Sequence, residues 1–81
     1  MKNENRIIQV NDISIGLNIK TIRQSKGLRQ IDIVAKLQLL GINISISSYS
    51  KIEAGRQNPT VSLLFALTQI FQCDFNTLFS C

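Results

Sequence analysis

The sequence predicts a compact all-α fold built from five short helices. Apolar residues recur three and four positions apart in several segments, as they do on the buried face of a helix. Capping residues precede most of these segments, and glycines follow three of them. Strict apolar–polar alternation is confined to residues 42–46, where a helical segment follows at once. With 81 residues, of which 44% are hydrophobic, the chain is long enough to bury one core.

Helix boundaries are predicted by the residues that stand just outside each periodic segment. Short polar side chains, which accept hydrogen bonds from the free N–H groups of a first turn, precede four of the five segments. Gly27, Gly41 and Gly55 follow the first three segments and predict their ends. The predicted helices cover residues 13–26, 30–40, 46–54, 61–71 and 75–79, with Asn11 or Asp12, Ser45, Thr60 and Asp74 as capping residues.

The same spacing predicts which side chains face the core. In the third helix Tyr49 and Ile52 point inward, with the Tyr49 hydroxyl at the edge of the core. Leu28 is expected to be a buried plug between the first two helices. The other predicted core residues are Ile15, Ile19, Ile22, Ile33, Val34, Leu37, Leu40, Val61, Leu64, Leu67, Thr68 and Phe71. The further apolar residues Leu63, Phe65, Ile70, Phe75 and Phe79 suit either the core or a surface between two copies of the chain.

Composition excludes several classes of function. The chain has no histidine, no Gly-rich phosphate loop and no paired carboxylates, so we expect neither an enzyme nor a metal or cofactor site. Cys73 and Cys81 fit no metal-binding spacing. No apolar run is long enough to span a bilayer and no signal peptide precedes the domain, so a cytoplasmic protein without a membrane partner is expected. We expect residues 1–11 to form an N-terminal arm and residues 12–81 the domain.

The charge balance leaves two explanations open. A formal net charge of +4 suits a polyanionic partner, of which nucleic acid is the commonest, but a modest excess of basic residues also serves solubility alone.

Four sequence features occur in a fixed order along most of the chain. They are Ile15-Gly-x-x-Ile19 with Arg23, Gly27-Leu-x-Gln30, Ser45-x-Ser-Ser-x-Ser-Lys-Ile-Glu53-x-Gly55, and Asn58-Pro59. This set resembles the Cro-type (lambda-repressor-like, XRE) helix-turn-helix DNA-binding family. The resemblance implies a five-helix DNA-binding domain in which the helix over residues 46–54 enters the major groove.

The sequence departs from the pattern of this family in two places. The connection between the second and third helices is several residues longer than usual, which predicts a lengthened turn. Val34 stands where the family has a small residue at the crossing of these helices, and Ala35 beside it is expected to allow the close approach instead.

The resemblance and the exposed positions together predict a DNA-binding surface. Serine hydroxyls donate and accept, Lys51 can reach a guanine edge or a phosphate, and Ile46 suits a thymine methyl group. Family members bind phosphate with the glutamine that matches Gln30. The predicted DNA-binding residues are Arg29, Gln30, Ser45, Ile46, Ser47, Ser48, Lys51, Arg56 and Asn58. A solvated helix face, an ordinary surface arginine at Arg56, and packing of Ile46 on the longer turn are the alternatives.

Arg23 and Glu53 have a different expected role. In the family these positions form an ion pair that ties two helices together, so the resemblance implies a structural pair rather than a DNA contact.

The favoured interpretation is a sequence-specific transcriptional regulator, repressor-like, that binds double-stranded DNA as a homodimer on a two-fold operator. The alternative is an antitoxin or other protein-interaction module of a toxin–antitoxin system, with a toxin or another regulator as its protein partner.

Overall fold

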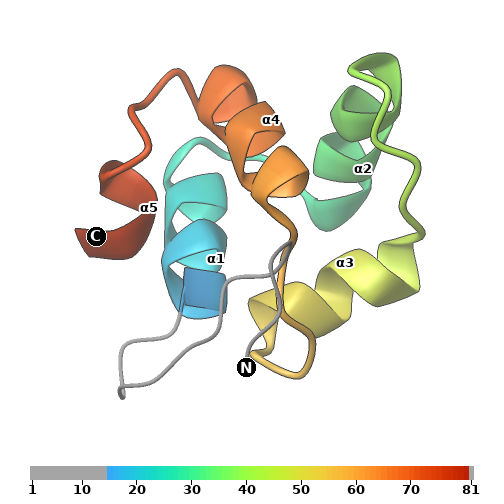
Figure 1. Ribbon diagram of the computed structural model, residues 1–81, viewed down its shortest axis with the longest axis horizontal. Helices are drawn as coiled ribbons and strands as arrows, with labels where there is room; N and C mark the ends of the chain where they lie inside the picture. Colours follow the sequence, from blue (N-terminus) through green and yellow to red (C-terminus); the bar gives the residue numbers. More distant parts are fainter. Residues whose placement is uncertain (1–14, 81) are drawn as a thin grey trace.

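The computed structural model describes residues 15–80, which form five helices and no strand (Figure 1). The helices are α1 (Ile15–Ser25), α2 (Gln30–Leu39), α3 (Ile46–Glu53), α4 (Val61–Phe71) and α5 (Thr77–Ser80). The predicted all-α class and five-helix order are confirmed. The predicted N-terminal arm and the capping residues Asn11 and Asp12 lie outside the described residues. No helix within residues 15–80 is long and apolar enough to cross a membrane.

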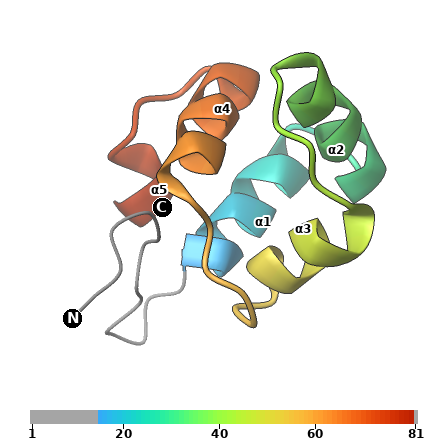
Figure 2. The ribbon, with the colours of Figure 1, turned by 45° about the vertical axis from the view of Figure 1, so that its right-hand side comes forward.

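The helices enclose one core. α1 packs against α3 and α5, and α2 packs against α3 and α4, so that α3 closes one end of the domain (Figures 1 and 2). Each fully buried aliphatic or aromatic side chain stabilises the fold by roughly 1.5–3 kcal/mol. The fully buried hydrophobic side chains at the centre are Ile19, Ile33, Leu37, Tyr49, Ile52, Leu64, Leu67, Phe71 and Leu78.

Two of the predicted helix caps are present as hydrogen bonds. The Ser45 hydroxyl accepts from the Ser48 N–H at 3.0 Å and begins α3. The Thr60 hydroxyl accepts from the Leu63 N–H at 3.1 Å and begins α4. Such caps are each worth about 1 kcal/mol, and they fix where the two helices start.

The start of α5 differs from the prediction. The Asp74 carboxylate accepts from the Thr77 N–H at 3.0 Å, so the residues between them form a turn and the helix begins at Thr77 rather than at residue 75. Asp74 also accepts from the Thr77 hydroxyl at 2.7 Å.

The close approach of helices occurs at Gly16 and not at Ala35. Gly16 lies against the backbone at the end of α3, where an added Cβ would be 2.8 Å from the Glu53 carbonyl oxygen and closer still to that of Ile52. Ala35 is exposed and Val34 is buried, so the prediction that Ala35 allows a close crossing is wrong. The absence of a side chain at Gly16 is what lets α1 contact α3 directly.

The lengthened turn predicted between α2 and α3 is present over residues 40–45. Leu40, predicted to be in the core, is 45% exposed because α2 ends before it. Gly41 then adopts a φ of 87°, a conformation that favours glycine, and the Ile42 N–H donates to the Leu37 carbonyl at 2.9 Å. Ile42 and Ile44 pack against the core while Asn43 and Ser45 are exposed, so the turn alternates between inward and outward side chains.

Candidate nucleic-acid interface

One face of α3 is free of packing. Ile46, Ser47 and Lys51 are exposed, whereas Tyr49 and Ile52 on the opposite face are buried. Ser47 and Lys51 are four residues apart and therefore lie one helical turn apart on the same side. The result is an outward row of one apolar, one hydroxyl and one cationic side chain.

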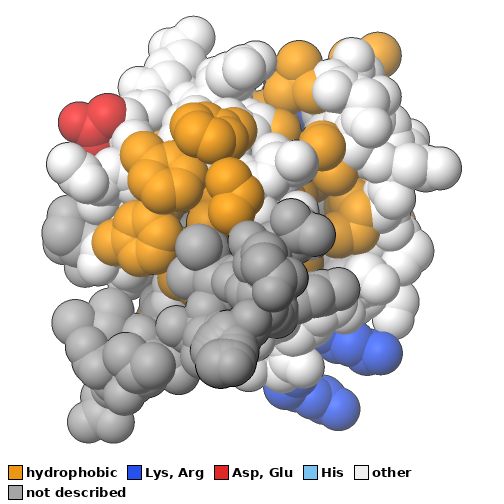
Figure 3. All heavy atoms as spheres, viewed as in Figure 1, with side chains coloured by type: hydrophobic (Ala, Val, Ile, Leu, Met, Phe, Trp, Pro, Cys, Tyr) orange, Lys and Arg blue, Asp and Glu red, His pale blue; other side chains and the backbone are white. Residues whose placement is uncertain are grey.

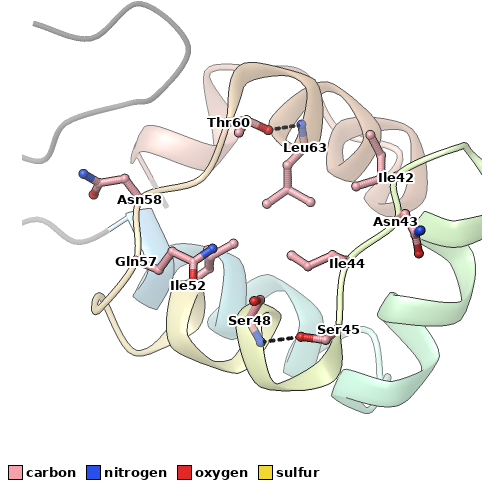
Figure 4. Close-up of a pocket in the computed structure, with 10 residues that line it drawn as sticks. All are labelled: Ile42, Asn43, Ile44, Ser45, Ser48, Ile52, Gln57, Asn58, Thr60 and Leu63. Carbon is pink, nitrogen blue, oxygen red and sulfur yellow. Dashed lines mark hydrogen bonds between the residues drawn. The ribbon is translucent and has the colours of Figure 1, made fainter.

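Ser48 has a different surrounding from Ser47. It is half-buried, and its side chain points into a pocket between α3 and the segment that precedes α4 (Figure 4). Gln57 and Asn58, both half-buried, line the other side of this pocket. Ser48 therefore lies at the edge of the outward face and not within its central row.

The inner face of α3 ends in a bidentate ion pair. The Arg23 guanidinium donates to both carboxylate oxygens of Glu53, with Nε–Oε2 at 2.7 Å and Nη2–Oε1 at 3.1 Å. The two side chains are only 10% and 2% exposed. Arg23 also donates to the carbonyl of Leu28 at 2.7 Å. Leu28 packs against the core but is only half-buried, so the prediction of a buried plug is confirmed only in part.

Gln30 joins the same cluster. Its side-chain amide donates to Glu53 Oε1 at 3.0 Å. The carboxylate of Glu53, the last residue of α3, therefore links α3 to Arg23 of α1 and to Gln30, the first residue of α2. Burial raises the pKa of Glu53, but hydrogen bonds, chiefly from Arg23, outweigh it and hold the pKa below its ordinary value. The hydrogen bond to Glu53 raises the pKa of Arg23. Both groups are therefore charged at neutral pH.

Tyr49 lies next to this pair and is in the core as predicted, but the prediction that its hydroxyl lies at the rim is wrong. The hydroxyl is fully buried and makes no hydrogen bond of good geometry among the described residues. Burial, together with the neighbouring Glu53 carboxylate, raises the pKa of Tyr49. Tyr49 and Glu53 are four residues apart on one helix, and that spacing is the sequence signal that places them side by side.

The remaining predicted contact residues lie outside α3, just before α2 and just after α3. Arg29 is exposed and forms an ion pair with Asp32 at 2.9 Å, and its N–H donates to the same carboxylate at 2.8 Å. Hydrogen bonds from the Arg29 side chain and backbone lower the pKa of Asp32. Arg56 is exposed just beyond α3. Basic side chains are visible at the lower edge of the molecule, on the side of α3 (Figure 3).

The structure brings together most, but not all, of the predicted positions. Ile46, Ser47 and Lys51 share one exposed face, and Ser45, Ser48 and Asn58 surround the adjacent pocket. Gln30 is joined to the ion pair, and Arg29 is engaged by Asp32. Within residues 15–80 no three potential ligands gather in a way that would hold a metal ion.

α3 is exposed on one face and packed against α1 and α2 on the other, and the turn after α2 leads into it. This arrangement defines a helix-turn-helix domain. The family model described as Helix-turn-helix (HTH_3) matches residues 19–78. The chain therefore belongs to this family, whose members are DNA-binding regulators and not enzymes.

Several solved structures are similar to the chain. The restriction-modification controller protein C.AhdI from Aeromonas hydrophila matches with a TM-score of 0.71 at 19% identity, over 83% of this chain and 94% of that protein. An HTH_3 family transcriptional regulator from Vibrio cholerae matches with a TM-score of 0.66 at 26% identity, over 84% of this chain but only 35% of that protein. No curated protein matches the chain in sequence.

Proposed function

We propose that the chain is a sequence-specific transcriptional regulator that binds duplex DNA with α3 in the major groove. The observation that carries this proposal is the outward row on α3. Ile46, Ser47 and Lys51 are exposed, whereas the inner face of the helix is buried and its Glu53 carboxylate is paired with Arg23. Serine pairs with several base edges, isoleucine suits a thymine methyl group, and lysine suits a guanine edge or a phosphate.

The charge distribution supports an anionic partner. Within residues 15–80 the acidic residues are Asp32, Glu53 and Asp74, and each is engaged within its own domain. Lys51 and Arg56 are exposed on or just beyond α3. Among residues 15–80, the face we assign to DNA thus presents cations without a nearby uncompensated carboxylate, as phosphate contacts require.

Phosphate contacts are assigned to the residues on either side of α3. Gln30 begins α2, where backbone N–H groups and the helix dipole favour an anion, and its amide keeps a second N–H beyond the one given to Glu53. Arg29, Arg56 and Asn58 complete the proposed set. A domain bound in this way over a promoter excludes other proteins from it, and for that reason we favour a repressor. We further propose that this repressor works in the cytoplasm.

The first prediction concerns DNA affinity. We expect the wild type to bind the promoter of its own operon about 10³-fold more tightly than it binds scrambled DNA. Lys51→Ala is expected to weaken promoter binding about tenfold or more, and Ser47→Ala to reduce the preference between the two DNAs. Fluorescence anisotropy at several salt concentrations measures both effects. If Lys51 contacts a phosphate, the slope of log K against log salt falls by ~0.9.

The matched control is Lys36→Ala. Lys36 is also an exposed lysine, but it lines a groove between the end of α2 and α4, away from α3. Equal losses for Lys36→Ala and Lys51→Ala would contradict a specific role for α3. An absence of binding to either DNA at low salt would overturn the regulator proposal and favour the protein-interaction module, such as an antitoxin.

We also propose that the regulator is a homodimer joined through an aromatic patch, defined here as Phe65, Phe75 and Phe79. Phe65 is 56% exposed and Phe79 36% exposed, and Phe75 contacts both rings at centroid distances of 5.1 and 5.3 Å. Hydrophobic side chains gather over α4 and α5 in Figure 3. Leu63, in contrast, is buried and belongs to the core. Monomers rarely leave several large rings exposed together.

The second prediction tests this patch. We expect the wild type to sediment as a dimer at micromolar concentrations and Phe65→Ser/Phe79→Ser to sediment as a monomer with weaker promoter binding, because one domain makes only half of the contacts. Leu39→Ser is the control, since Leu39 is 86% exposed but lies outside the patch. A wild-type monomer at high micromolar concentration would contradict the dimer.

A further inference from the structure

The pocket beside α3 is formed by three parts of the chain, of which the first two are consecutive in sequence. Its volume is about 290 Å³. One wall is the lengthened turn, a second is the side of α3 that carries Ser48 and Ile52, and a third is the segment before α4 together with Leu63 of α4 (Figure 4). The lining residues are Ile42, Asn43, Ile44, Ser45, Ser48, Ile52, Gln57, Asn58, Thr60 and Leu63.

The walls of the pocket are held in place by hydrogen bonds. The hydrogen bond between Ser45 and the Ser48 N–H fixes the α3 side, and the one between Thr60 and the Leu63 N–H fixes the α4 side. On the turn, the Ile42 N–H is held by the Leu37 carbonyl. The additional length of the turn supplies Ile42 and Ile44 to the pocket, so this cavity is a direct result of the departure noted in the sequence.

The lining of the pocket combines apolar side chains with uncharged polar ones. No lining residue carries a charge, the aliphatic side chains of Ile44, Ile52 and Leu63 point toward the middle, and amides and hydroxyls surround them (Figure 4). An apolar cavity of about 150 Å³ takes up benzene, and ligand sites begin at roughly 300 Å³. The pocket therefore matches a small molecule with one ring, and no charged side chain lines it to pair with an ionised group.

We propose that this pocket binds a small uncharged molecule with an apolar ring and one amide or hydroxyl group. The ring contacts the aliphatic side chains, and the polar group is hydrogen-bonded by the surrounding amides and hydroxyls. Ser45, Ser48 and Asn58 line the pocket and are also among the DNA-binding residues predicted from the sequence. Occupancy of the pocket and DNA binding consequently compete, a second claim that rests on the proposed function.

Binding is tested without DNA, on the full chain labelled with ¹⁵N. Benzamide, benzyl alcohol and cyclohexanol are titrated separately, and the backbone amide signals are followed by NMR. We expect at least one probe to give saturable shifts confined to residues 42–48, 52, 57–58, 60 and 63, with a Kd on the order of 1 mM. Shifts that do not saturate, that spread over the surface, or that are absent for all three probes overturn the proposal.

Two variants fill the pocket from opposite sides. Ile44→Trp places a ring in it from the turn, and Gln57→Trp places one over its mouth from the opposite wall without altering a fully buried residue. Each is expected to weaken probe binding at least tenfold. Leu39→Trp adds the same ring outside the pocket and is expected to bind the probe as the wild type does. If both filling variants, shown to be folded by their spectra, still bind the probe normally, the assigned site is wrong.

The competition with DNA is measured afterwards. Saturating probe is expected to weaken promoter binding several-fold in the wild type and to leave Gln57→Trp unaffected. Probe binding without any change in DNA affinity overturns the competition and leaves the ligand site standing. Failure of the protein to bind DNA at all overturns the proposed function, and the NMR titration distinguishes that outcome from failure of the pocket.

Discussion

Glu53→Ala is expected to lower the free energy of unfolding by ~3–5 kcal/mol, because it leaves the buried Arg23 guanidinium without its carboxylate partner. The pair has two hydrogen bonds and side chains that are 10% and 2% exposed, so solvent can replace little of what is lost. The Gln30 amide loses its acceptor in the same step. For a domain of this size such a loss is a large part of the total stability.

Urea unfolding followed by circular dichroism measures the effect. Arg29→Ala is the matched control, since it removes an arginine–carboxylate pair of similar length that is exposed to solvent. We expect this control to change the unfolding midpoint only slightly. A Glu53→Ala variant that is no less stable than Arg29→Ala would show that the buried pair does not hold the helices together.

The pH dependence of the same pair gives a second readout. Folding lowers the pKa of Glu53, so the unfolded chain takes up the proton more readily than the folded chain does. The stabilisation from this carboxylate is complete above its unfolded pKa, close to the ordinary value of 4.5, and is lost as the pH falls through the lower folded pKa. The wild type should therefore lose stability below about pH 4.5 more steeply than Glu53→Gln does.

Gly16→Ala is expected to destabilise the protein by about 3 kcal/mol, the upper part of the range for overpacked sites. Helix propensity alone predicts the opposite sign, because alanine is favoured over glycine by up to ~1 kcal/mol within a helix. The added methyl group would meet the carbonyl oxygens of Ile52 and Glu53, which are backbone atoms and cannot turn aside. α1 and α3 would have to separate, and the orientation of α3 would change with them.

Thermal and urea unfolding distinguish these two expectations. Thr21→Ala, an exposed substitution on the same helix, is the control and should be neutral or slightly stabilising. Promoter binding by Gly16→Ala should also be weaker than the loss of folded protein explains, since α3 is displaced. A Gly16→Ala protein as stable as the wild type would mean that α1 and α3 approach less closely than the distances at Gly16 indicate.

The elements of the fold were largely predictable because their signals are local. The predicted bounds of α4 are confirmed, and the caps at Ser45 and Thr60 form the expected hydrogen bonds. The predicted start of α5 was wrong by two residues because the Asp74 side chain begins a turn before the helix. Leu40 was assigned to the core by continuing the periodicity of α2 past its true end.

The parts that were not predictable depend on contacts between distant segments. Helical spacing placed Tyr49 inward, but it did not show that its hydroxyl is enclosed beside the Glu53 and Arg23 side chains. The close contact at Gly16 depends on where the end of α3 lies. The length of the connection between α2 and α3 was visible in the sequence, whereas the pocket it forms with the segment before α4 was not.

The alternation in the lengthened turn limits how this connection can change in length. Ile42 and Ile44 face the core while Asn43 and Ser45 face outward. Inserting one residue after Gly41 would exchange the two sides, turning an amide toward the core and an isoleucine toward solvent, whereas inserting two would restore the order. The number of inserted residues must therefore be even to keep both isoleucines facing the core, and natural variants of the connection should differ in length by even numbers of residues.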